Sequence, residues 1–568
     1  MDTQVADSRG AENRVDGEDL SLRRTAAECV PIFLAACFFL FLGMPLRPNV
    51  YDEGIVLTNA MRVAEGQVPH RDFYANYGPA QFYIIGGLFK GFGESILVER
   101  LYDLFIRGLL VALIYAIVSR YCQRWLAIST AIGALVWLYA LYGTAGFATV
   151  PAALLNLIAA SLLVTVFVHD VSLWRMLAIG SIAGVATLFR YDTGIALLAV
   201  AACAIAIAIT MRSKGDRLAA AARMFGSCLL GFALVVLPAT IRYLLIAPPR
   251  AFMHDIILYP GKYYNHARGI PFPAVSLSHL DNLEIYLLIA VISFSIYASI
   301  VSYRRIRSHC DPSRHSDSSE REWFGFFVTF TLLVLAMYCK AFVRITVIHL
   351  FLAIIPSLLL LSGLLERREI FPLPVRIAIA FLIAVSLLPA SSSSLSMHWE
   401  NPSVESQIVA SIHGKKAPEL EAEWCKSAGA LTKTLCFLPD DDRIRTIEFI
   451  DSHTTQDQKV FLGVPRHDRI YANDNLTYFA AQRLPATKWS HFDPDLQNRY
   501  DIQAEIIREL GTTAPPYIVL DSEFETIYEP NDSSRSSGVT LLDDYIHSKY
   551  QHLKTYGALD IWQRTSTP

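Results

Sequence analysis

Long apolar stretches, separated by short polar segments, fill the first two-thirds of the chain. Each approaches the ~20 mostly apolar residues that a helix needs to cross a membrane. The pattern therefore predicts a polytopic α-helical membrane protein with about eleven transmembrane helices, at residues 28–46, 100–118, 125–143, 147–168, 174–190, 192–211, 224–247, 283–303, 322–341, 346–365 and 373–390.

Around residue 391 the pattern changes to that of a soluble α/β domain. The segment SSSSLSMHWENPS is polar and Ser-rich, which is typical of a linker. Beyond it, KVFLGVP (459–465), PYIVLD (516–521) and ALDIWQR (558–564) are predicted strands. The segments DRIRTIEFIDSH, IQAEIIREL and LLDDYIHSKYQHL have the spacing of amphipathic helices.

These patterns predict three parts of the chain. Residues 1–24 form a polar, disordered tail. Residues 25–390 form the transmembrane domain, whose longest early loop is the first outer loop, residues 46–99. Residues 391–568 form the C-terminal α/β domain.

The distribution of Lys and Arg predicts the orientation in the membrane. If the tail is cytoplasmic, every basic cluster falls in a loop on the same side, including Arg120 with Arg124 and Arg367 with Arg368. Cytoplasmic loops carry an excess of such residues. An odd number of spans then puts the first outer loop and the C-terminal domain outside the cytoplasm.

Composition and charge narrow the class of protein further. Of 568 residues, 53% are hydrophobic and only 18% are charged, which argues against a soluble enzyme of this length. The mean hydropathy is +0.35. A net charge of −3 gives no indication of nucleic-acid binding.

The nine cysteines include no C-x-x-C motif and no Cys/His cluster with zinc spacing. Cys425 and Cys436 are the two in the C-terminal domain, in a segment rich in small and polar residues. Outside the cytoplasm the environment is oxidising, so a disulfide between them is predicted. Two buried free thiols remain the alternative.

The first outer loop begins with an unusual pair of acids. Asp52 and Glu53 open an apolar segment that ends at Gly66, so residues 53–65 are predicted to form a short helix at the outer membrane interface. The helix dipole favours ionised carboxylates at that end. Such a carboxylate can act as a general base or bind a cation, although simple helix capping would also explain the pair.

The loop continues with GQVPHRDFYANYGP, in which His70, Arg71, Asp72 and Tyr77 lie close together. An acidic pair after the first span, followed by G-x-x-P-[YH]-R-D-F-Y…Y-G-P, resembles the GT-C superfamily of membrane glycosyltransferases. The most similar branch contains the protein O-mannosyltransferases and the lipid A aminoarabinose transferases. The segment VPRHDRIYANDNLTYFAAQRLPATKW of the C-terminal domain is similar to the tail of many uncharacterised bacterial members.

The resemblance implies an inverting transfer of sugar from a polyprenyl-phosphate carrier to a hydroxyl of a glycan, lipid or protein acceptor. Transfer would occur at the outer face of a bacterial inner (plasma) membrane. Asp52 would be the base, and Glu53 would orient a neighbour or hold the loop. His70, Arg71, Asp72 and Tyr77 would be candidates for binding the donor phosphate or the substrate.

Cations are also needed to stabilise a departing lipid phosphate. Arg190 and Arg344 stand at predicted outer ends of spans, with His349 following Arg344. Related sequences often read R-x-D-x-x-H there, but this chain has Thr346 at the position of the Asp, which questions a metal or proton role. Either arginine could instead extend toward lipid headgroups.

The outer loop 248–282 offers two more candidates, Lys262 and Arg268, in YPGKYYNHARG. They could bind the donor phosphate, form part of a lid, or belong to an ordinary polar loop. No ligand set for a metal is apparent in the sequence, and a requirement for a divalent cation is left open.

Two other classes of protein remain possible from the sequence. A transporter or flippase for a lipid-linked sugar would explain the spans and the arginines, but not the adjacent acids. A membrane-anchored, non-enzymatic surface-binding protein would depend on its outer domain alone.

Overall fold

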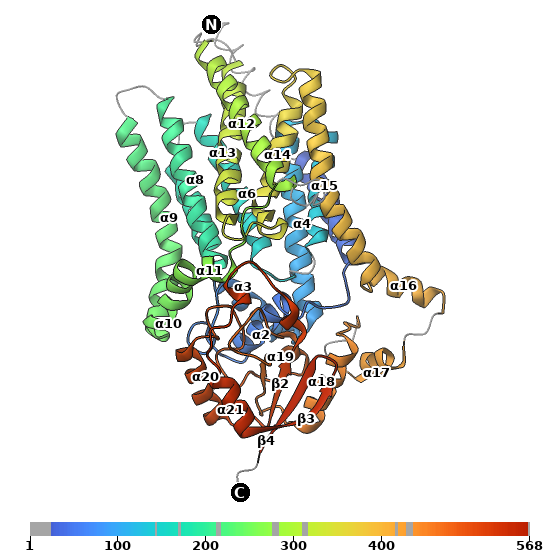
Figure 1. Ribbon diagram of the computed structural model, residues 1–568. Coiled ribbons are helices and arrows are strands. Elements are labelled where there is room, and N and C mark those ends of the chain that lie inside the picture. Colours follow the sequence, from blue (N-terminus) through green and yellow to red (C-terminus); the bar gives the residue numbers. More distant parts are fainter. Residues whose placement is uncertain are drawn as a thin grey trace.

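The computed structural model describes residues 24–141, 145–168, 172–211, 217–274, 283–308, 316–414, 418–427 and 435–565. The predicted tail, apart from Arg24, lies outside the described residues. The described chain forms a bundle of long helices at one end and a mixed sheet with shorter helices at the other (Figure 1).

Each of the eleven predicted spans coincides with a helix. Within the described residues, eight helices are long and apolar enough to cross a membrane, and three more are apolar but shorter. The chain is therefore an integral membrane protein, while the number of crossings stays a prediction. The helices are Arg24–Leu42, α4 (Ile96–Tyr121), α5 (Arg124–Ala140), α6 (Thr149–Val164), α7 (Leu173–Phe189), α8 (Tyr191–Thr210), α9 (Arg217–Ile246), α12 (Leu283–Ser308), α13 (Ser316–Ala341), α14 (Val347–Glu366) and α15 (Leu373–Glu400).

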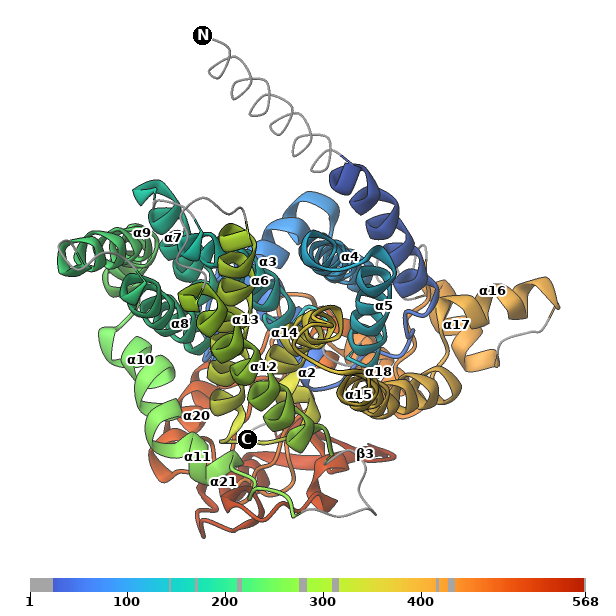
Figure 2. The same ribbon diagram turned by 90° about the horizontal axis from the view of Figure 1, so that it is seen from above.

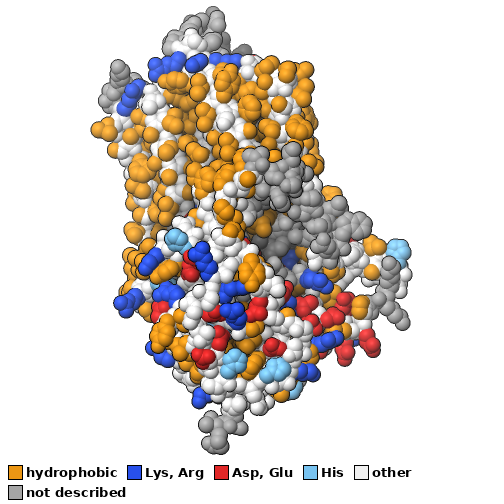
Figure 3. All heavy atoms as spheres, viewed as in Figure 1, with side chains coloured by type: hydrophobic (Ala, Val, Ile, Leu, Met, Phe, Trp, Pro, Cys, Tyr) orange, Lys and Arg blue, Asp and Glu red, His pale blue; other side chains and the backbone are white. Residues whose placement is uncertain are grey.

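One end of the bundle carries basic residues that pair across helices. Arg120 lies 2.6 Å from Glu322, and Arg367 lies 2.6 Å from Glu320. Figure 3 shows a hydrophobic band over the bundle, with Lys and Arg gathered along the edge farthest from the C-terminus. The pairs of Arg120 and Arg367 therefore bring described parts of the predicted inside loops to one end of the bundle, and which side of the membrane this end faces stays a prediction.

The opposite end of the bundle is covered by short helices from the two outer loops. These are α2 (Asp52–Ala64) and α3 (Ala80–Phe92) from the first, and α10 (Pro249–Met253), the π-helix η4 (His254–Tyr263) and α11 (Tyr264–Arg268) from the second. In Figure 1, α2 and α3 lie between the bundle and the sheet.

Helix α2 matches the short helix predicted at residues 53–65, and it is buried. Its position at the membrane interface stays a prediction. Leu57 and Ala60 are fully buried, and a Cβ on Gly54 would lie 2.5 Å from the backbone nitrogen of Leu476. The helix has apolar side chains on several faces, and they are all buried: Ile55, Val56, Leu57, Ala60, Met61 and Val63. It therefore packs against α3 on one side and the C-terminal residues on another.

The sheet has the strand order β1-β2-β4-β3. Strand β1 (Phe461–Gly463) pairs in parallel with β2 (Tyr517–Asp521), and β4 (Leu559–Arg564) is antiparallel to both β2 and β3 (Tyr550–Tyr556). Helices α18 (Asp441–His453), α20 (Tyr500–Thr513) and α21 (Leu541–Lys549) accompany it. We call the described residues 435–565 the C-terminal unit.

Two sequence predictions in this half were wrong. The last predicted helix ends at Lys549, because the residues after it form β3 and pair with β4 through a tight turn at Gly557, whose φ is 55°. The predicted Ser-rich linker is instead helical, since α15 continues to Glu400. Once a helix is nucleated, each further residue adds a hydrogen bond at little cost.

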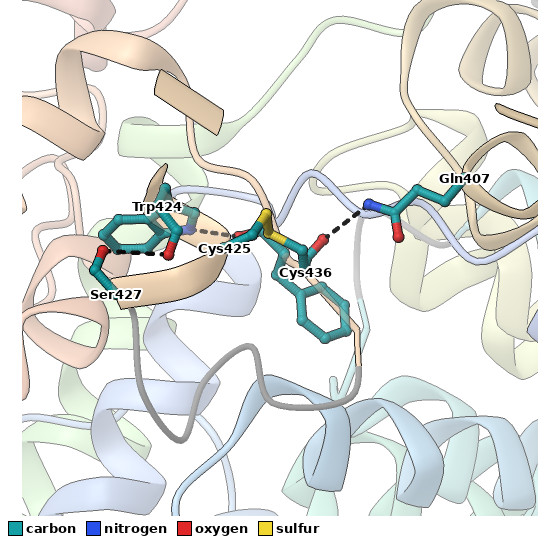
Figure 4. The surroundings of a disulfide bond; sticks show 6 residues. Gln407, Trp424, Cys425, Ser427 and Cys436 are labelled. Atoms are coloured by element: carbon teal, nitrogen blue, oxygen red, sulfur yellow. Dashed lines mark hydrogen bonds between the residues drawn. A yellow bond between two sulfur atoms is a disulfide. The ribbon is translucent and has the colours of Figure 1, made fainter. Parts of the chain in front are cut away.

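Cys425 and Cys436 are joined by a disulfide (Figure 4). The indole of Trp424 donates to the carbonyl of Phe437 at 2.9 Å, which holds the two ends of the segment together. Helices α16 (Val404–Ile412) and α17 (Glu419–Ser427) lie at one side of the molecule in both ribbon views (Figures 1 and 2), and α17 is next to α18 in Figure 1.

Candidate functional site

Asp52 stands at the start of α2, but it does not cap the helix. The side-chain oxygen of Asn49 accepts from the backbone N–H groups of Tyr51 (3.0 Å) and Asp52 (2.7 Å). Among the described residues, the Asp52 carboxylate accepts no hydrogen bond, and the side chain is half-buried. Capping therefore does not account for this acid.

The surroundings of Asp52 make it a stronger base than an ordinary aspartate. Burial raises the pKa of its carboxyl to about 6. The positive charges of Arg268 and Arg344 oppose this rise, and the negative charge of Asp493 adds to it. A carboxylate with such a pKa is ionised at neutral pH and can still accept a proton efficiently.

Glu53 has a different environment. It is fully buried, and its two oxygens accept from the guanidinium of Arg100 at 2.5 and 2.8 Å. One of them also accepts from the backbone N–H of Asn49 at 2.8 Å. Glu53 thus connects the start of α2 to α4. Of the two roles that the resemblance implies for Glu53, this contact fits that of holding the loop.

A cavity of about 220 Å³ lies near Asp52, between the η4–α11 segment and the helix ends that face the C-terminal unit. Asp52 does not line this cavity, but the charge of Asp52 acts on Tyr77, and Tyr77 does line it. The lining residues are Asn76, Tyr77, Arg190, Tyr191, Asp192, Tyr259, Pro260, Tyr264, Asn265, Lys340, Ala341, Val343, Arg344 and His349.

Cations outnumber anions in this lining. Asp192 is shared by Arg190 at 3.2 Å and Lys340 at 2.9 Å, so one carboxylate partners two cations. Arg190 also donates to the hydroxyl of Thr149 at 2.8 Å and lies over the ring of Tyr77. An excess of positive charge in a partly enclosed space suits a phosphate group.

Arg344 is held by the C-terminal unit. Its guanidinium donates to both oxygens of Glu529, at 2.7 and 2.5 Å, and to the carbonyl of Arg268 at 3.1 Å. Burial alone would raise the pKa of Glu529, but hydrogen bonds from Arg344 and Asn531 lower it to about 2. Nearby, the ring nitrogen Nδ1 of His349 lies 2.7 Å from the hydroxyl of Thr346.

Several predicted residues lie outside the cavity. His70 is buried with Nδ1 3.0 Å from Asp255, after the chain turns at a φ of 65°. Arg71 and Asp72 form a partly exposed pair with each other at 2.7 Å. Lys262 is exposed over the ring of Tyr263. The structure therefore brings Tyr77, Arg190, Arg344 and His349 together around the cavity, but not His70, Arg71, Asp72 and Lys262.

Arg268 lies beside the cavity, buried against the C-terminal unit. It donates to the Tyr471 carbonyl at 2.7 Å and to Asp493 at 3.2 Å. Sequence reasoning missed Asp493, Glu529 and Lys340. For Lys340 a signal existed, since a lysine at the end of a span needs a polar partner. Nothing in the local sequence marks the two acids of the C-terminal unit.

No protein-family model matches the sequence, and neither does any curated protein. The fold is similar to the crystal structure of ArnT from Cupriavidus metallidurans bound to undecaprenyl phosphate, with 12% identity, a TM-score of 0.52, and coverage of 95% of this chain and 98% of that one. An oligosaccharyltransferase of Archaeoglobus fulgidus, tethered with an acceptor peptide, gives 10% identity, a TM-score of 0.46, and coverage of 95% and 74%.

The similarity to ArnT spans nearly all of both chains. The fold that the first outer loop suggested is therefore confirmed as one that the chain shares with ArnT. At this identity the similarity is one of fold, and activity must be argued from the site.

Proposed function

We propose that the protein is an inverting glycosyltransferase that moves a sugar from a polyprenyl-phosphate carrier to an acceptor hydroxyl. The observation that carries the proposal is the position of Asp52. A carboxylate with a pKa of about 6 stands next to a cavity that presents Arg190, Lys340 and Arg344. A base beside an anion site is what this reaction requires.

The proposed chemistry is a single displacement. Asp52 removes the proton from the acceptor hydroxyl, whose oxygen forms a bond to the anomeric carbon of the sugar. The bond between that carbon and the phosphate oxygen breaks, and the lipid phosphate leaves with its electron pair. Arg190, Lys340 and Arg344 stabilise the charge that grows on the phosphate. One displacement at the anomeric carbon inverts its configuration.

A lipid-borne donor fits the proposed location of the site. Nucleotide sugars stay in the cytoplasm, so a transferase at the outer face needs a donor carried by a membrane lipid. The asymmetry of Lys and Arg supports an N-terminus in the cytoplasm and a C-terminal domain (391–568) outside a bacterial inner membrane. The ArnT structure of the same fold is bound to undecaprenyl phosphate, which supports a lipid of this class.

The test is to compare envelope lipids, glycans and glycoproteins by mass spectrometry in cells with the wild-type gene, the deletion, or Asp52→Asn. The proposal expects the deletion to remove one sugar from one class of product, and Asp52→Asn to reproduce that loss at normal protein levels. A non-enzymatic surface-binding protein predicts no lost sugar. A flippase predicts that Asp52→Asn restores the product, which would contradict the proposal.

A further inference from the structure

The side chain of Asp493 gathers polar groups from three separate parts of the chain. Its Oδ2 accepts from the hydroxyl of Tyr74 and the amide of Asn76, each at 3.1 Å. Its Oδ1 accepts from Arg268 at 3.2 Å and from the hydroxyl of Tyr51 at 3.4 Å. Asp493 itself is 2% exposed.

These partners belong to segments close to the proposed base. Tyr51 precedes Asp52 in the chain, and Asn76 lines the cavity. Arg268 belongs to α11 in the second outer loop, and its carbonyl accepts from Arg344. The carboxylate thus connects the segment of the base, the cavity wall and the second outer loop, although it comes from a distant part of the sequence.

We propose that Asp493 is a positioning residue for the Asp52 centre, so that the C-terminal unit completes the site and does not merely cover it. The inference rests on the proposed function. Asp493 also forms a buried ion pair with Arg268, and both charges are fixed close to Asp52.

Removing either partner of a buried ion pair leaves the other charge uncompensated. The pair therefore fixes the local electrostatics as well as the geometry.

The charged and titratable groups that act on Asp52 define the expected effect. Burial raises the pKa of both Tyr51 and Tyr77, so these phenols stay neutral. The remaining charges are Arg268 on α11, Arg344 after α13, and Asp493 on the C-terminal unit. Within the described residues, Asp493 is the only negatively charged group among those that shift the pKa of Asp52. Removing the charge of Asp493 therefore lowers the pKa of Asp52.

The test is the pH profile of kcat/KM for Asp493→Asn, with Asp543→Asn as the matched control. Asp493 lies 3.3 Å from a buried histidine, His491, whose ring nitrogen is also 3.1 Å from the hydroxyl of Tyr51. Asp543 is likewise the partner of a buried histidine on the C-terminal unit, His467, but it touches neither outer loop in its described contacts. A base must be ionised, so activity rises with pH through the pKa of Asp52. Asp493→Asn is expected to move this rise to lower pH, and the control is expected to leave it in place.

A loss of activity at every pH with an unmoved profile would overturn the inference, because it would indicate a structural role alone. If Asp493→Asn does not fold, Arg268→Gln tests the pair from its other side. The influence of Arg268 on Asp52 exceeds that of Asp493, so the profile should then move to higher pH, whether or not Asp493 becomes protonated. An unmoved profile in that variant would also overturn it.

A second readout does not require transfer. An apolar carbodiimide reacts with protonated carboxyls, so peptide mapping of Asp52 labelling against pH reports its ionisation directly. Asp493→Asn should shift this labelling curve to lower pH. If the wild-type protein transfers no sugar yet the curve shifts, the proposed function fails while the positioning role stands. If transfer occurs and neither curve shifts, the positioning role fails alone.

Discussion

Arg344 donates to both carboxylate oxygens of Glu529, a residue 185 positions away in the C-terminal unit. Arg344 also lines the cavity beside Asp52. The carboxylate of Glu529 therefore accepts two hydrogen bonds from the planar guanidinium of Arg344, in the arrangement that a phosphate group would also use. If Arg344 binds the donor phosphate, the phosphate must displace Glu529 or share the guanidinium with it.

Glu529→Gln is expected to tighten the binding of undecaprenyl phosphate by about tenfold, because it removes a charged competitor for Arg344. The measurement is a binding isotherm with the purified protein in nanodiscs. Glu523→Gln is the matched control, since Glu523 pairs with Arg443 away from the cavity. Unchanged or weaker binding in Glu529→Gln would show that the pair does not compete with the lipid.

Arg190→Ala and Arg344→Ala should each weaken undecaprenyl phosphate binding by about tenfold or more, because a charge-assisted hydrogen bond to the phosphate is lost. The corresponding lysine variants should lose less, since the charge remains and only the two-pronged geometry is lost. The measurement is a binding isotherm of undecaprenyl phosphate for each of the four variants, compared with the wild type. If both alanine variants bind like the wild type, these arginines serve as headgroup anchors or structural pairs.

The pH dependence of transfer should report Asp52. Burial raises its pKa to about 6. A base is active when ionised, so kcat/KM should be constant near neutral pH and fall about tenfold per pH unit well below pH 6. A profile recorded between about pH 4.5 and 8 checks this expectation. Activity that continues undiminished to the acidic end would exclude a carboxyl of this pKa as the base.

The disulfide tests the predicted topology. Thiol labelling of intact membranes, with and without reductant, followed by peptide mapping, should find Cys425 and Cys436 protected until reduction. Replacing both with Ser should lower the free energy of unfolding by up to ~3 kcal/mol, as expected for closing a loop of this size. Free thiols at both positions, together with failure of an impermeant reagent to reach them from outside, would invert the proposed orientation.

The sequence predicted the bundle well because the membrane imposes a simple rule on helix length and composition. It failed where burial depends on distant residues. The helix α2 was predicted, but its burial was not, since nothing near Gly54 reveals that Leu476 packs directly against it. Strand β3 was also taken for the end of a helix, although its partner β4 follows it directly in the chain.

The site shows the same division. Asp52 was singled out by the acidic pair that opens the first outer loop, and Arg344 because an arginine at the end of a span is costly and therefore conspicuous. Asp493 and Glu529 were not, since a carboxylate in a soluble segment is ordinary until the fold places it beside an arginine. His70 was a candidate for binding the donor; in the structure it pairs with Asp255 from the second outer loop and does not line the cavity that holds Arg190 and Arg344.

The central claim is that Asp52 removes a proton in the transfer step. Once the sugar donor is known, the most direct measurement is single-turnover transfer by purified Asp52→Asn in nanodiscs. Asp501→Asn, an exposed acid on α20, is the control. The account predicts a rate loss of about 10²–10⁴-fold for Asp52→Asn, with undecaprenyl phosphate binding and thermal stability unchanged. A variant that keeps more than about a tenth of the wild-type rate would contradict it.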